Sequence, residues 1–273
     1  MSFSKIFDFV RIVQNHVRVN SSFDEKITVF SHSSCHSVGG AFPLLIAVIT
    51  MFFSQSTIVS TAILLAFIAF SMMMTLVSSK VLTHTVLKGE ASSFVLELPP
   101  FRRPQFLKIV GQTVKEKVLF VLMRAVVVAA PAGLIIWILA NIRVGDAMLL
   151  SIIAQALDPI GRVMGLDGVI LLGFILGFPA NEIVIPIILM VYLSTGELSD
   201  YASLEGLKTI LIDNGWTATT ALCTCVFSMF HFPCSTTLLT IIKETKSFKW
   251  SALSIILPLA IGTVLCILIN LVL

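Results

Sequence analysis

Charged side chains are scarce in this chain, and that scarcity decides its class. Only 12% of the 273 residues are charged, whereas 57% are hydrophobic. Soluble globular domains carry about 25% charged and about 45–50% apolar residues. The composition therefore excludes a soluble domain and predicts an integral membrane protein. The net charge of +3 is small, and the lysines and arginines form no continuous stripe, so we expect no nucleic-acid partner.

Motifs for nucleotide and hydrolytic chemistry are absent from the sequence. It contains no G-x-x-x-x-G-K-[ST] loop, no H-E-x-x-H helix and no G-x-S-x-G elbow. We therefore expect no enzyme activity, and any use of nucleotide energy would have to come from another domain. The five cysteines are an odd number, and four lie in or beside apolar runs, which excludes a disulfide framework.

Long apolar runs are what the chain does contain. Residues 57–77, 118–140 and 250–273 approach or exceed the roughly 20 residues that cross a bilayer, and each is predicted to span it. Residues 41–53 are short for a crossing, and the run either forms a half-helix or begins within the preceding loop. The connection 80–117 is rich in lysine and arginine, so the positive-inside rule places it in the cytoplasm.

Two more apolar runs, 169–193 and 216–242, are each interrupted by a proline. Proline frees backbone carbonyls, which membrane proteins tolerate only inside the protein or beside a wet cavity. Paired broken helices are the best sequence indication of a transporter's binding site. The residues predicted to form the breaks are Phe178, Pro179, Phe232 and Pro233.

The first break carries an acid. Because proline suits the first turn of a helix, a half-helix over 179–193 would place Glu182 near its positive end, with the amide of Asn181 beside it. A carboxylate in the membrane usually marks an ion or substrate path, so these two residues are predicted to handle a cation. The alternative is that Glu182 caps its own helix or pairs with Arg124.

The second break carries softer donors. Imidazole and thiolate suit first-row transition metals, so His231 and Cys234 are predicted to line a metal path. The alternative for Cys234 is that of a small hydrophobic packing residue. Cys35 lies near two histidines in a loop, which is the composition of a metal cluster but equally that of a solvated loop.

Orientation predicts a re-entrant element. If both interrupted runs crossed completely, the basic segment 243–249 would face outward, against the positive-inside rule. One re-entrant hairpin removes this conflict. The predicted fold is therefore an all-α, polytopic membrane helix bundle with interrupted or re-entrant half-helices.

Six motifs carry a resemblance to a known family. They are TVLKGE at 85–90, FVLELPPFRRP at 94–104, GFPANEIVIP at 177–186, DNGW at 213–216, HFPCSTTL at 231–238 and KET at 243–245. In this order they cover roughly residues 41–273. The chain resembles the C-terminal half of FeoB-type bacterial ferrous iron transport proteins.

The resemblance implies a multi-pass permease of the bacterial cytoplasmic membrane that carries Fe²⁺ inward. It implies two Gate segments, each with a cysteine beside a proline on the iron path. Cys234 matches the second of these cysteines. Cys35 would be the first, although this stretch lacks the family's arginine and has a longer spacing to its proline. The predicted organisation is a leader, loop or interfacial helix at 1–40, a partial first Gate with the basic loop at 41–117, and a second Gate at 118–273.

The resemblance also implies partners. FeoB-type proteins carry a GTP-binding domain, which we expect here as a separate domain or subunit of a split or truncated transporter. Membrane lipid surrounds the chain, homo-oligomers are left open, and Fe²⁺ is cargo rather than a permanently bound cofactor. Two alternatives stay open: a Gate-type permease for a nucleoside or another small solute, and a membrane scaffold subunit that transports nothing.

Overall fold

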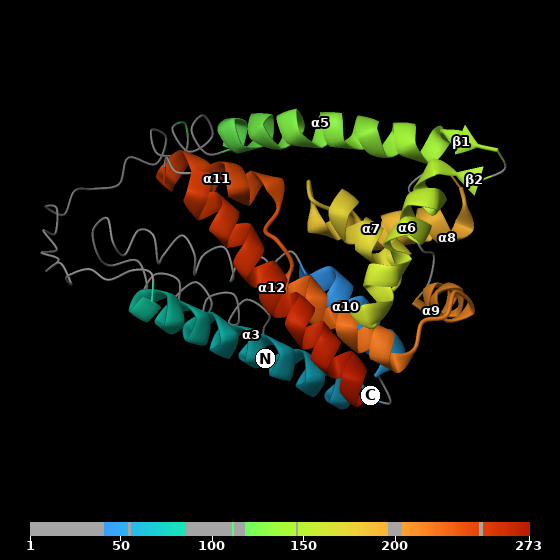
Figure 1. Ribbon diagram of the computed structural model, residues 1–273, viewed down its shortest axis with the longest axis horizontal. Helices are drawn as coiled ribbons and strands as arrows, with labels where there is room; N and C mark the ends of the chain where they lie inside the picture. Colours follow the sequence, from blue (N-terminus) through green and yellow to red (C-terminus); the bar gives the residue numbers. More distant parts are fainter. Residues whose placement is uncertain are drawn as a thin grey trace, which may run out of the picture.

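The computed structural model describes residues 41–53, 56–85, 111, 118–145, 147–195, 204–245 and 248–273 (Figure 1). Residues 1–40, which include Cys35 and the predicted leader, loop or interfacial helix, lie outside these residues. The helices, in chain order, are Ala41–Phe52, α3 (Thr57–Thr85), α5 (Phe120–Asn141), α6 (Leu149–Val163), α7 (Gly168–Leu176), the 3₁₀ helix η2 (Asn181–Ile183), α8 (Val184–Leu193), α9 (Leu204–Asp213), α10 (Ala218–Phe230), α11 (Ser235–Thr245) and α12 (Phe248–Val272).

Strands play a small part in the described structure. A short antiparallel hairpin, β1 (Arg143–Val144) and β2 (Ala147–Met148), joins α5 to α6, with Arg143 opposite Met148. Helices supply all the other regular elements of the described residues. The predicted helical bundle is therefore confirmed, with this hairpin as a minor addition.

Among the described residues, three helical segments are long and apolar enough to cross a membrane: Thr57–Ser78, Ala218–Ile242 and Ser251–Val272. The second of these contains the break between α10 and α11. The helices α6 and α7 form a pair that is bent by 108°. If this pair is counted as one span, the number of candidate spans rises to four. α5 adds an apolar helix of 22 residues whose side chains are largely exposed, as on a lipid-facing surface.

α7 and α8 form a helical hairpin. Gly173 of α7 faces Ile188 and Val184 of α8, and Gly177 also faces Val184, which is the pairing of antiparallel helices. With 9 and 10 residues, the two helices are only about 14–15 Å long, half of the roughly 30 Å of a bilayer core. That this hairpin enters and returns on one side of the membrane stays a prediction of the charge argument.

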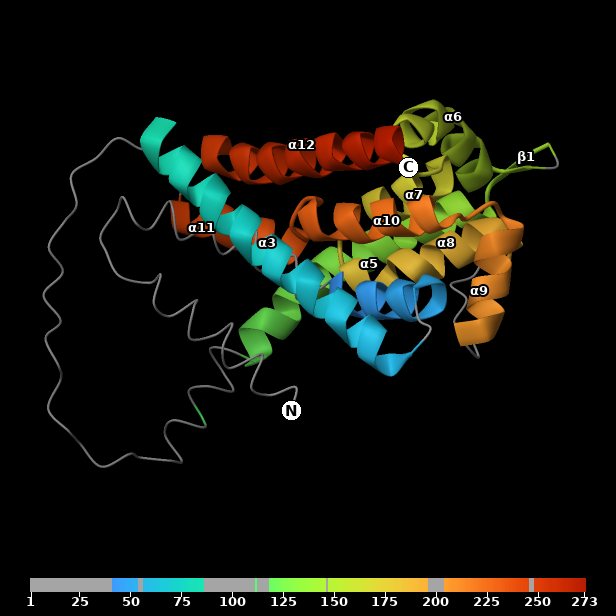
Figure 2. The same ribbon diagram turned by 90° about the horizontal axis from the view of Figure 1, so that it is seen from below.

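The helix ends gather at two ends of the molecule. The end of α3, the start of α5, the end of α11 and the start of α12 lie together on the left of Figure 1. The β1–β2 hairpin, α9 and the C-terminus lie on the right, and Figure 2 shows the same arrangement. The two basic segments predicted to share the cytoplasmic side are thus joined to helix ends on one side of the bundle.

The first half-helix lies at the centre of the core. Leu45, Val48 and Ile49 of Ala41–Phe52 are at most 1% exposed and belong to one cluster with Phe174 of α7 and Phe227 of α10. Burial of this kind stabilises by about 25 cal/mol per Å² of apolar surface. The core therefore holds the short helices, and the long ones surround them.

Two predicted boundaries are wrong, one at the end of α3 and one at the start of the half-helix after the first break. α3 continues to Thr85, so Lys80 belongs to a helix rather than to the basic connection. α6 runs from Leu149 to Val163 and includes Pro159. Here Asp158 holds the last turns, because it accepts a hydrogen bond from the Gly168 N–H and pairs with Arg162. The half-helix after the first break begins at Asn181 rather than at Pro179, which lies in a turn.

Candidate functional site

The two proline breaks lie against each other. The backbone N–H of Ser235, at the start of α11, donates to the carbonyl of Phe178 in the hairpin tip, with 3.0 Å between nitrogen and oxygen. The rings of Phe178 and Phe232 are 5.6 Å apart at a tilted angle. Freed backbone groups of one break are thus satisfied by the other, which is how irregular backbone is tolerated at membrane depth.

A polar pair also joins the breaks. His231 Nε2 lies 3.1 Å from the side-chain oxygen assigned to Asn181, fifty positions away in the sequence. On the other side of the ring, Nδ1 lies 2.7 Å from the carbonyl oxygen of Ser228. A carbonyl only accepts hydrogen bonds, so Nδ1 carries the proton and donates to Ser228.

Aromatic rings surround His231. Its ring centroid is 5.2 Å from that of Phe174, 6.4 Å from Phe227 and 5.4 Å from Phe232. Its side chain is only 1% exposed, so it is the most enclosed of the polar residues predicted for the path. The ring is therefore fixed in direction by packing as well as by hydrogen bonding.

Cys234 follows Pro233 and is half-buried. Its Sγ lies 3.2 Å from the hydroxyl oxygens of both Thr236 and Thr237. The neighbouring Ser235 is 5% exposed, and its hydroxyl has no hydrogen-bond partner among the described residues. A buried polar atom without a partner calls for an explanation, and an unseen ion or water is one.

Glu182 and Asn181 occupy the same short 3₁₀ turn, η2, at the hairpin tip. Glu182 is exposed and Asn181 half-buried. Among the described residues no group of three or more His, Cys, Asp or Glu side chains gathers as a metal cluster. The structure therefore brings Asn181 and His231 together, but it does not assemble Glu182, His231 and Cys234 into a closed metal cage.

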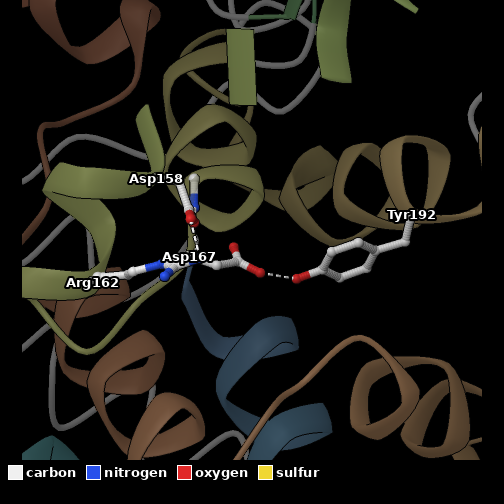
Figure 3. Close-up of polar contacts among 5 residues, drawn as sticks. Asp158, Arg162, Asp167 and Tyr192 are labelled. Carbon is white, nitrogen blue, oxygen red and sulfur yellow. Dashed lines mark hydrogen bonds and ion pairs between the residues drawn. The ribbon is translucent and has the colours of Figure 1, made fainter. Parts of the chain in front are cut away.

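A second polar centre was missed by sequence reasoning (Figure 3). Asp167 caps α7 by accepting from the Ile170 N–H at 2.6 Å, and it also accepts a hydrogen bond from the Tyr192 hydroxyl of α8. The indole N–H of Trp216 donates to the same hydroxyl at 2.9 Å. These bonds tie together α7, α8 and the approach to α10. An aspartate before an apolar run is a helix-start signal, so Asp167 could have been found.

The same region is hollowed. Arg162 pairs with Asp158 at 2.6 Å, and a pocket of about 280 Å³ lies beside this pair and Asp167 (Figure 3). Its polar lining consists of Ser151, Gln155, Asp158, Asp167, Tyr192 and Asn214. Every carboxylate of this lining already has a hydrogen-bond partner, so the arrangement first of all fixes the corner between α6 and α7.

Candidate spans, a helical hairpin and meeting breaks define the class: a multi-pass helical membrane protein with discontinuous helices. Residues 122–248 match the Gate family, described as "Nucleoside recognition", and residues 64–115 match the family "Ferrous iron transport protein B C terminus". The chain is a relative of the C-terminal membrane region of FeoB proteins, as its motifs predicted. The prediction of a multi-pass membrane protein is confirmed by the candidate spans of the described residues.

Curated relatives named "Fe(2+) transporter FeoB" support this kinship. The chain is 26% identical over 251 residues to the protein of Staphylococcus aureus (strain MSSA476), covering 88% of this chain and 35% of the relative. It is 30% identical over 171 residues to that of Synechocystis sp., covering 61% and 26%, and 24% identical over 252 residues to one from Leptospira interrogans, covering 83% and 36%. The chain thus spans about a third of the length of these relatives. No solved structure matches it significantly.

Proposed function

We propose that this chain carries Fe²⁺ inward across the membrane as the permease part of a FeoB-type transporter. The observation that carries the proposal is the meeting of two broken helices, with nitrogen, sulfur and oxygen donors at the junction. Discontinuous helices that meet within a bundle are where secondary transporters place their substrate and ion sites. The relatives named as Fe(2+) transporters indicate the cargo.

The donor set suits this cargo. His231 offers a nitrogen, Cys234 a sulfur and Glu182 an oxygen at the same junction, where Asn181 lies against the His231 ring. Mixed donors of this kind favour first-row transition cations over Mg²⁺ and Ca²⁺, which prefer oxygen alone. An open, incomplete set also allows release, because conduction requires weak binding at each step. Cys35 is proposed as a further sulfur on the path, from the resemblance alone.

Energy and assembly belong to the proposal as well. This sequence contains no nucleotide-binding motif. A separate GTP-binding domain or subunit would therefore bind and hydrolyse GTP. Membrane lipid covers the exposed apolar faces of α3 and α5, and homo-oligomers are an open form of the assembly. Iron passes through as cargo and leaves no resident cofactor.

Uptake of radioactive Fe²⁺ in a host without other iron importers tests the proposal. Cys234→Ala should lower uptake by about tenfold or more, as expected for loss of a metal contact. Cys225→Ala is the matched control, because Cys225 is fully buried within α10 and away from the break. Equal uptake by both variants and the unaltered chain would remove Cys234 from the path.

Two rival functions have their own outcomes. The match to the family described as "Nucleoside recognition" favours a small-solute permease as the second candidate. Uptake of a labelled nucleoside in the same host, with no iron uptake, would move the assignment there. A scaffold subunit would give neither flux after reconstitution of the chain with a GTP-binding partner.

A further inference from the structure

The contact between Asn181 and His231 has the arrangement of a covered metal ligand. We propose that the Asn181 amide is an exchangeable cover on Nε2 of His231, and that the transported divalent cation takes its place. This inference rests on the proposed function and names the nitrogen through which the chain selects its cargo. The ligand class is a divalent first-row transition cation.

The direction of the ring supports a metal-binding role for Nε2. Nδ1–H of His231 donates to the Ser228 carbonyl at 2.7 Å, which leaves the lone pair of a neutral ring on Nε2. Metal-binding histidines nearly always anchor their other nitrogen in this way, because the anchor fixes the tautomer and aims the lone pair. Here the anchor comes from α10 and the lone pair is aimed at the hairpin tip.

The partner of that lone pair is a side chain that can donate. Nε2 lies 3.1 Å from the side-chain amide of Asn181, whose oxygen is assigned to the position that faces the ring. Oxygen and nitrogen of an amide are assigned from hydrogen bonding, and two acceptors would repel. With the amide turned over, Nδ2–H of Asn181 donates to Nε2. The cover is then a single neutral hydrogen bond, which a cation can displace.

The breaks do not need this hydrogen bond in order to meet. The Ser235 N–H to Phe178 carbonyl bond and the tilted contact between the rings of Phe178 and Phe232 already join them. Asn181 stands at the start of the 3₁₀ turn η2, after an extended Ala180 and outside the α-helices of the hairpin. Because His231 is 1% exposed with the cover in place, Asn181 must move before a cation can reach Nε2.

Binding of Co²⁺ to the full chain in detergent tests the inference. Co²⁺ is an air-stable stand-in for Fe²⁺, and its visible absorption reports coordination by nitrogen and sulfur. Asn181→Ala should bind Co²⁺ about fivefold more tightly, because one competing hydrogen bond is gone. His231→Asn keeps a donor for the Ser228 carbonyl but lacks Nε2, and should weaken binding by about tenfold or more.

The controls separate exchange from a merely structural contact. Asn214→Ala removes an exposed asparagine directly after α9 and should leave Co²⁺ binding unchanged, and Mg²⁺ should not compete in any form. The inference is overturned if Asn181→Ala binds Co²⁺ no more tightly than the unaltered chain, if His231→Asn binds equally well, or if the unaltered chain binds no Co²⁺. Should His231→Asn fail to fold, the Asn181→Ala comparison still decides, because it leaves the ring in place.

The two proposals fail in different ways. A chain that shows this pattern of Co²⁺ binding but gives no iron uptake with its partner would contradict the proposed function and keep the covered ligand. A chain that takes up iron while His231→Asn binds Co²⁺ normally would contradict the covered ligand and keep the proposed function.

Discussion

One phenol joins three elements at the end of the molecule that carries the β1–β2 hairpin. The Tyr192 hydroxyl donates to Asp167 and accepts from the Trp216 indole. Tyr192→Phe leaves a half-buried carboxylate and a buried indole N–H without this partner. We expect a loss of about 1–3 kcal/mol in the free energy of unfolding.

Thermal unfolding in detergent measures this loss. Thr209→Ala is the matched control, because it removes an exposed hydroxyl that bonds only within α9, and it should change stability by less than about 0.5 kcal/mol. Equal stability of Tyr192→Phe and Thr209→Ala would show that the phenol does not connect the helices.

Residue-level prediction succeeded where a residue type is rare at membrane depth. Both predicted breaks, at prolines 179 and 233, are found in the structure, whereas Pro131 and Pro258 lie inside continuous helices. The partner of His231 is fifty positions away, and no local pattern links it to Asn181. Whether the predicted path residues touch iron stays a prediction, and Cys35 lies outside the described residues.

The close packing of the short helices depends on glycine residues at their contacts. A Cβ on Gly168 would lie 1.9 Å from the backbone oxygen of Ala154, whereas a Cβ on Gly133 in α5 would meet nothing within 4 Å. Gly168→Ala should therefore destabilise the fold by at least about 2–3 kcal/mol, because backbone atoms would have to move.

Gly133→Ala is the control in the same measurement. It should be neutral or stabilise by up to about 1 kcal/mol, because alanine is the better helix former. If the two variants unfolded at the same temperature, α6 and α7 would not pack as closely as the structure has them.

Elements were predicted better than their ends. Apolar run lengths and prolines indicated the spans, the half-helices and the hairpin, because bilayer thickness and backbone satisfaction fix them. The passage of α6 through Pro159 was missed, because the bonds of Asp158 that hold this region come from tertiary contacts. The β1–β2 hairpin was missed because its strands have only two residues each.

The path of the whole chain sets which side each end faces. If α5 crosses the membrane, the α7–α8 hairpin returns, and α10 with α11 crosses back, then Lys80 and Lys249 should lie on one side and Asp213 on the other. Single variants Lys80→Cys, Lys249→Cys and Asp213→Cys, labelled with a thiol reagent that cannot cross membranes, measure this.

Only Asp213→Cys should react in intact cells, and the other two should react after permeabilisation. All three side chains are exposed, so access is set by sidedness rather than by burial. If Lys80→Cys and Lys249→Cys were labelled from opposite sides of the membrane, the hairpin would cross the bilayer completely.

Iron uptake by a chain with both breaks cross-linked tests the central claim most directly. In Phe178→Cys with Phe232→Cys, the two thiols replace rings whose centroids are 5.6 Å apart. Oxidation should join the breaks and stop Fe²⁺ uptake, reduction should restore it, and each single variant should be unaffected by both treatments. Uptake that continues at the same rate in the cross-linked chain, or thiols that never join, would contradict a cargo path through the meeting of the two breaks.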